Sequence, residues 1–189
     1  MTITEIKKAA LSNFTEKGYD GTSLSDIAQK VGIKKQSIYS HFKSKDELFL
    51  TVMHEVVNEE RNFLHQFFDE HQPDLKNYLE NLILEFKERY INNEECNMKF
   101  VLRMAYMPPV HLREEVIQDF TLYFLELENL LNELFLNTKA FSARAEIVTL
   151  SFLTLLDGLL VALMYGGIER FNQKFQASWE IYWKGLLNG

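Results

Sequence analysis

A dense run of hydrogen-bonding side chains follows Gly32, where the sequence continues Ile-Lys-Lys-Gln-Ser-Ile-Tyr-Ser-His-Phe-Lys-Ser-Lys. Placed on the outer face of a short helix, several of them offer the donors and acceptors that read base edges in a major groove. These are Lys35, Gln36, Ser37 and Ser40. Three others carry donors suited to phosphate oxygens, namely Tyr39, His41 and Lys45. The run therefore predicts a surface that binds nucleic acid.

Two short helices and a tight turn would have to position these side chains. Ser23 and Asp26 stand three residues apart, the spacing of a capping box at a helix start. Ala28 leaves room for a second helix to pack across the first. Gly32 tolerates the positive φ that the turn between them needs. The arrangement predicts a helix-turn-helix, with Ile38 and Phe42 on the buried side of its second helix.

The segment from Gly21 to Leu48 resembles the DNA-binding region of the TetR/AcrR family of bacterial regulators. The positions that fall at the family's spacing are Asp26-Ile-Ala28, Gly32, Ile38-Tyr39, His41-Phe42, Lys45 and Leu48. The resemblance covers about residues 3–50 and implies a recognition helix at about 35–41. It implies the same groove and phosphate contacts as above, with Ser25 reaching DNA from the preceding helix. It also implies a cytoplasmic homodimer on a palindromic operator, released by a ligand in the C-terminal domain.

The composition predicts an all-α chain, since its 189 residues include only three Pro and eight Gly. We expect about nine helices: a three-helix N-terminal domain at 1–46, and a ligand-binding and dimerisation domain at 47–189. Pro108-Pro109 should break one helix, and Gly166-Gly167 should end another. The expected helices begin near residues 3, 24, 35, 45, 74, 96, 110, 141 and 171.

Charge is distributed unevenly along the chain. Residues 1–50 hold eight Lys and six acidic residues, a net charge of +2, whereas the remainder has twelve basic and twenty-one acidic residues, a net charge of −9. A double-stranded DNA partner is therefore plausible only at the N-terminal part.

Aromatic and Met residues of the second domain are either plain core or the lining of a pocket for a small apolar or amphipathic effector. The candidates are Phe67, Phe100, Arg103, Tyr106, Met107, Phe124 and Phe152. Arg103 stands in an otherwise uncharged stretch and needs a partner if buried. That partner is either an internal acid such as Asp157 or the carboxylate or phosphate of a ligand.

The last two expected helices are similar to the pair that forms the dimer interface of the family. The candidate interface residues are Leu155, Leu159, Leu163, Trp179 and Trp183. The apolar stretch 147–168 has the length of a membrane span, but Asp157 at its middle favours a buried or interface helix. We therefore expect no membrane partner.

Other interpretations of the sequence have less support from its motifs. His54-Glu55 resembles the start of a zinc-protease helix, but Asn58 stands where the second His is required. We expect no catalytic residue, no metal, no cofactor and no enzyme. The single Cys96 excludes an internal disulfide and fits a reducing cytosol, and the N-terminus lacks the features of a signal peptide. The alternatives that stay open are an activator in place of a repressor, and a helical carrier whose head no longer binds DNA.

Overall fold

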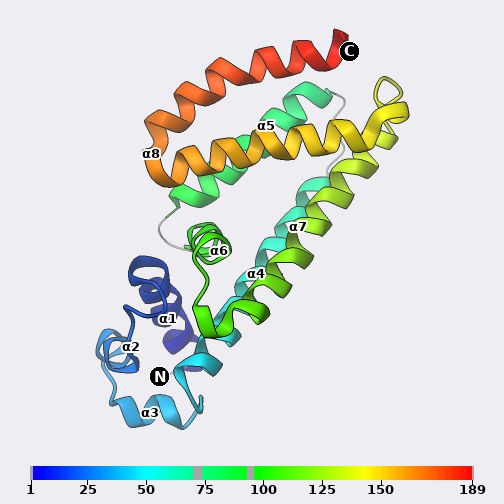
Figure 1. The fold of residues 1–189 in the computed structure, drawn as a ribbon. Helices are drawn as coiled ribbons and strands as arrows, with labels where there is room; N and C mark the ends of the chain where they lie inside the picture. Colours follow the sequence, from blue (N-terminus) through cyan, green and yellow to red (C-terminus); the bar gives the residue numbers. More distant parts are fainter. Residues whose placement is uncertain (1, 70–73, 93–95, 189) are drawn as a thin grey trace. The chain divides into compact units, whose positions relative to one another are not determined.

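The computed structural model describes residues 2–69, 74–92 and 96–188, and these ranges are helical with no strand (Figure 1). The elements are α1 (Ile3–Lys17), α2 (Leu24–Val31), α3 (Lys35–Tyr39), α4 (Lys45–Asp69), α5 (Leu75–Ile91), α6 (Asn97–Tyr106), η1 (Val110–Leu112), α7 (Arg113–Leu136), η2 (Ser142–Arg144) and α8 (Ala145–Asn188). The prediction of an all-α fold is confirmed.

The break expected at Gly166-Gly167 is present inside α8. Gly167 has φ 71° and ψ −171°, a non-helical conformation at which two helical segments meet. With α8 counted as two, the described residues form the nine α-helices that the sequence predicts. Some starts differ: Pro109 is followed by the 3₁₀ turn η1, so α7 begins at Arg113 rather than at Val110, and the 3₁₀ turn η2 precedes α8, which begins at Ala145 rather than near residue 141. The helix expected to begin near residue 74 is α5, which begins at Leu75.

The chain divides into two compact units. The first comprises residues 1–63 and 89–123, and therefore contains α1, α2, α3 and α6. Its core is an aromatic cluster in which Phe49 packs edge-on against Phe14 and Tyr19, with ring centroids 5.2 Å apart in both cases. Phe100 of α6 reaches the same cluster, 5.9 Å from Phe49. Phe14, Phe49 and Phe100 are fully buried.

The second unit comprises residues 64–88 and 124–189, with most of α5 and all of α8. Phe171, Phe175, Trp179 and Tyr182 form a row of stacked rings on α8, with successive centroids 6.0 Å apart. The indole Nε1 of Trp179 donates a hydrogen bond to Glu80 of α5 at 2.9 Å. The hydrogen bond from Trp179 to Glu80 joins α8 to α5 within this unit. The division of function between residues 1–46 and 47–189 stays a prediction.

Among the described residues, α8 is the one helix long and apolar enough to cross a membrane. Length and composition are weak evidence, because core helices of soluble proteins pass the same test. Phe152, Leu156 and Leu160 of α8 are buried inside the second unit, and the helix is interrupted at Gly167. Both observations fit the expectation of a packed helix.

Candidate nucleic-acid interface

The helix-turn-helix forms by the local interactions that the sequence predicts. The hydroxyl of Ser23 accepts a hydrogen bond from Asp26 N at 3.1 Å, and the Asp26 carboxylate accepts one from Ser23 N at 2.9 Å. Gly32 adopts the left-handed conformation with φ 76° and ψ 32°. The following N–H, that of Ile33, donates to the carbonyl of Ala28 at 2.9 Å and closes the turn.

Helix α3 is anchored by one side and presents the other to solvent. Ile38 is fully buried and packs α3 against the rest of the first unit. The Ser40 hydroxyl donates to the carbonyl of Ser37 at 2.7 Å, and the Lys35 ammonium lies 5.7 Å from the centroid of the Tyr39 ring. Most of the predicted DNA-binding residues are exposed in this region: Ser25, Lys35, Gln36, Ser37, Tyr39, Ser40 and His41. The structure therefore leaves these side chains accessible to solvent, and their grouping into one DNA-binding surface stays a prediction.

Lys45, in contrast, points its ammonium into the first unit. Its Nζ donates to the carbonyls of Tyr19 and Thr22, at 3.0 Å each, and lies 3.8 Å from the centroid of the Tyr19 ring. The side chain is half-buried. The phosphate contact that the sequence suggests for Lys45 would require these interactions to be given up.

The start of α4 carries a second capping arrangement. The Ser44 hydroxyl accepts from Glu47 N at 3.0 Å, as the spacing predicts, and the Glu47 carboxylate accepts from Lys43 N at 2.5 Å. Asp46, the residue before Glu47, accepts a hydrogen bond from the Tyr19 hydroxyl and lies 3.4 Å from His111 Nε2. The hydrogen bond from Tyr19 is the main cause that lowers the pKa of Asp46, and His111 lowers it further. Burial, this hydrogen bond and the nearby acids together raise the pKa of Tyr19.

The predicted effector residues are divided between the two units. Phe100, Arg103, Tyr106 and Met107 belong to the first unit, where Phe100 is core and Met107 is 63% exposed. The others belong to the second unit, where Phe152 is fully buried, Phe124 is exposed and Phe67 packs against the Tyr78 ring at 4.8 Å. Their grouping into one pocket stays a prediction.

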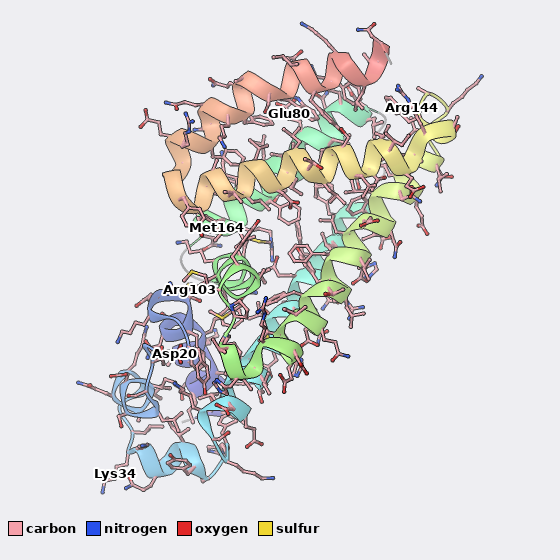
Figure 2. All side chains as sticks on the ribbon, viewed as in Figure 1. Asp20, Lys34, Glu80, Arg103, Arg144 and Met164 are labelled. Atoms are coloured by element: carbon pink, nitrogen blue, oxygen red, sulfur yellow. The ribbon has the colours of Figure 1, made fainter. Side chains whose placement is uncertain are left out.

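Arg103 has partners that neither sequence-based alternative included. Its Nη1 donates to the carbonyls of Thr15 at 3.1 Å and Glu16 at 3.3 Å, in the last turn of α1. Figure 2 labels Arg103 on α6 beside the blue α1. The guanidinium thus satisfies carbonyls that a helix C-terminus leaves unpaired.

Two hollows lie elsewhere. A cleft of about 550 Å³ in the first unit lies between α1 and α4 and reaches Arg89, Cys96 and Asn97. An apolar groove of about 510 Å³ in the second unit lies between the two segments of α8 and includes Leu155, Leu159 and Ile181. None of the seven predicted effector residues lines either hollow. The cleft was not predictable from the sequence, because its walls come from segments far apart in the chain.

The predicted dimer residues of α8 differ in burial. Leu159, Leu163 and Trp179 are buried within the second unit, whereas Leu155 and Trp183 are only half-buried. The most exposed apolar residues of α8 were not predicted, and include Ile147, Tyr165 and Ile181 at 71–74% exposure. The segment of α8 before Gly167 is apolar on nearly all sides, so its sequence pattern does not separate the inner face from the outer one.

Taken together, the exposed α3, the Gly32 turn and the helical body define the class of helix-turn-helix proteins with an all-α second domain. Residues 6–52 match the family model described as bacterial regulatory proteins, tetR family. This match assigns residues 6–52, about a quarter of the chain, to the DNA-binding region of TetR-family regulators.

Individual relatives support this assignment. The chain is 38% identical over 84 residues to IcaR of Staphylococcus epidermidis, a negative transcriptional regulator of the biofilm operon icaADBC. That match spans 43% of this chain and 45% of IcaR, so the chain covers about half the length of this relative. These matches are transcriptional regulators rather than enzymes, as the sequence predicts.

Solved structures share the fold over nearly the whole length. NalD of Pseudomonas aeruginosa, the secondary repressor of the MexAB-OprM multidrug efflux pump, has a TM-score of 0.70 at 22% identity, over 96% of this chain and 94% of NalD. FadR of Bacillus subtilis, solved in complex with stearoyl-CoA, has a TM-score of 0.65 at 16% identity, over 96% and 97% of the two chains. At these identities the likeness concerns the fold alone.

Proposed function

We propose that this chain is a dimeric, DNA-binding repressor that occupies a palindromic operator and leaves it when a small apolar or amphipathic effector binds. The single observation that carries the proposal is the solvent-facing side of α3, where Gln36 and its polar neighbours stand clear of the core while Ile38 alone anchors the helix. Such a helix can enter a major groove with its side chains directed at base edges.

Each exposed residue has a proposed role on DNA. Lys35, Gln36, Ser37 and Ser40 contact bases, whereas Tyr39 and His41 contact phosphates. Ser25 reaches a phosphate from α2, as the resemblance implies. Negative regulation is proposed on the model of IcaR, which is named a negative regulator.

The proposed dimer uses the outer face of α8. The groove there is almost wholly apolar in its lining, and Ile181 beside it is 74% exposed. Pairing two copies through this face would cover apolar surface that a monomer leaves in water. The two recognition helices of a twofold dimer would then read half-sites about 34–36 Å apart, one turn of the double helix.

The proposed effector binds in the C-terminal domain. The support is the fold shared with FadR, which was solved with stearoyl-CoA, and the aromatic and Met content of residues 47–189. The ligand would act by its differential affinity for the DNA-bound and free conformations, typically about 1–3 kcal/mol of coupling.

The test is selection of bound sequences from a random duplex pool with the purified protein. Enrichment of a palindrome with half-sites about one turn apart is expected. A half-site enriched without a symmetric partner would contradict the dimeric operator, and no enrichment at low salt would contradict sequence-specific binding. The selected operator then serves to screen apolar and amphipathic compounds for release of the protein.

A further inference from the structure

The turn that joins α1 to α2, residues 18–22, is held from outside by two cationic side chains. Arg103 of α6 donates to Thr15 and Glu16 just before the turn, and Lys45 of α4 donates to Tyr19 and Thr22 within it. The two cations come from helices distant in sequence, yet both bind backbone carbonyls of the same short segment.

The turn is also closed from within. Thr22 is 2% exposed, and its hydroxyl lies within hydrogen-bond distance of the carbonyls of Gly18 at 2.8 Å and Asn13 at 3.0 Å. Gly18 has φ 76° and ψ 175°, and a Cβ placed on it would stand 3.1 Å from Arg103 Nη2. The guanidinium therefore rests directly on the backbone of the turn.

The position of this turn bears on the recognition helix. Ser23, the residue that caps α2, follows Thr22 directly, and α2 packs against both α1 and α3. A displacement of the turn would therefore carry α2 and α3 with it. A second attachment is the short segment 40–44 that leads from α3 to α4.

We propose that Lys45 and Arg103 are positioning residues for DNA binding: they fix the α1–α2 turn to α4 and α6, and thereby fix the orientation of the recognition helix, without contacting DNA. The inference rests on the proposed function. For Lys45 it replaces the phosphate contact suggested by the sequence, because two of its three N–H donors are used by carbonyls and the Tyr19 ring covers the ammonium.

The first experiment separates a phosphate contact from a positioning role by salt dependence. Binding of a mixed-sequence duplex is measured against salt for the wild type, Lys45→Met and Lys34→Met. Lys34 is the matched control, an exposed Lys at the start of α3 whose side chain projects away from the domain in Figure 2. A lost phosphate contact lowers the slope of log K against log salt by about one.

We expect Lys45→Met to weaken binding while its slope stays at the wild-type value, and Lys34→Met to lower the slope. A slope for Lys45→Met reduced by about one would overturn the inference and restore the phosphate contact. If the wild type itself shows no salt-dependent binding, both the inference and the proposed function fail. The two failures are therefore distinguishable.

The second experiment separates positioning from mere stabilisation. Affinity is measured for the selected operator and for a version with its half-sites one base pair further apart. A loosened turn should tolerate the altered spacing, so the preference for the selected operator should fall at least about fivefold in Lys45→Met and in Arg103→Met. Lys45→Arg should keep the preference, because a guanidinium can also donate to the two carbonyls.

A role in stability alone would lower the fraction of folded protein and leave the ratio of the two affinities unchanged. An unchanged ratio together with a lower melting temperature would therefore overturn the inference. The double variant supplies a further check. The effects of Lys45→Met and Arg103→Met should be non-additive because both act on one turn, whereas strict additivity would show two unconnected roles.

Discussion

The carboxylate of Glu60 is completely buried and accepts two hydrogen bonds from the guanidinium of Arg89, one from Nε at 3.2 Å and one from Nη2 at 2.6 Å. The Arg89 side chain keeps 22% exposure and lies 4.2 Å from the centroid of the Phe63 ring. The two partners therefore differ in their access to water. We therefore expect removal of Arg89 and removal of the Glu60 charge to lower the free energy of unfolding by different amounts.

Arg89→Met should lower the free energy of unfolding by about 3–5 kcal/mol, because it removes the opposite charge and two hydrogen bonds from a fully buried carboxylate. Glu60→Gln should cost less, about 1–3 kcal/mol, because the guanidinium that remains can still reach water. Chemical denaturation of both variants measures the difference. Lys76→Met, which breaks an exposed pair with Glu180, is the control and should unfold close to the wild type. Equal losses for the two buried partners would contradict the argument.

Asp46 predicts a loss of stability in acid. Its folded pKa is lowered, chiefly by the hydrogen bond from Tyr19, so the group stabilises the fold above its unfolded pKa of about 3.9. That contribution is lost as the pH falls through the lower folded value. Asp46→Asn should therefore be less stable than the wild type at neutral pH, by at most about 1 kcal/mol for a side chain so exposed. The two stability curves should converge in acid.

Thermal unfolding of both proteins across the acid range measures this convergence. Tyr19→Phe removes the hydrogen bond that is the main cause of the lowered pKa. It should give a curve with the same convergence. A constant gap between Asp46→Asn and the wild type at every pH would show that the carboxylate charge plays no part.

Two glycines with the same φ predict different costs on substitution. Gly18 and Gly32 both have φ 76°, but ψ is 175° at Gly18 and 32° at Gly32. The first conformation is almost restricted to glycine, and a Cβ there would press on Arg103. Gly18→Ala should lower the free energy of unfolding by about 1–3 kcal/mol from the backbone conformation alone. Gly32→Ala should lower it by about 1 kcal/mol, because a Cβ there meets nothing within 4 Å. Urea unfolding of the two variants compares them, and a larger loss at Gly32 would refute the ranking.

Local features of the N-terminal domain were predictable because they are encoded within a few residues. The Ser23–Asp26 capping box, the turn at Gly32 and the buried Ile38 all depend on spacing in one short segment. The break at Gly167 follows equally from a local signal, a pair of glycines in an apolar run.

The partners of Lys45 and Arg103 were not predictable, because they depend on contacts between residues 23 to 88 positions apart. A Lys beside a recognition helix has the same sequence context whether its ammonium faces a phosphate or a carbonyl. The inner and outer faces of α8 were equally undetermined, so buried Leu159 was predicted alongside half-buried Leu155. Exposed Ile181, which the proposed dimer uses, was not among the predicted residues.

Gln36 on the exposed side of α3 should determine one base pair of each half-site. Gln36→Ala is expected to relax the preference there by about 1–3 kcal/mol and leave the other positions unchanged. Repeating the selection from the random pool measures this. Gln29→Ala is the matched control, because Gln29 is also exposed but lies on α2. A relaxed position for Gln29→Ala, or none for Gln36→Ala, would contradict the assignment of α3 as the recognition helix.

Ile181 provides the test of the proposed dimer. It is 74% exposed and lines the apolar groove of α8. A carboxylate buried there at a twofold contact would face an apolar surface without a partner. Ile181→Glu should therefore sediment as a monomer with an unchanged helical circular dichroism spectrum, and should lose most of its affinity for the palindromic operator. Val110→Glu is the control, because Val110 is 88% exposed in the first unit, outside that groove. Its dimer should persist, and a persistent dimer of Ile181→Glu would place the interface on another face of the chain.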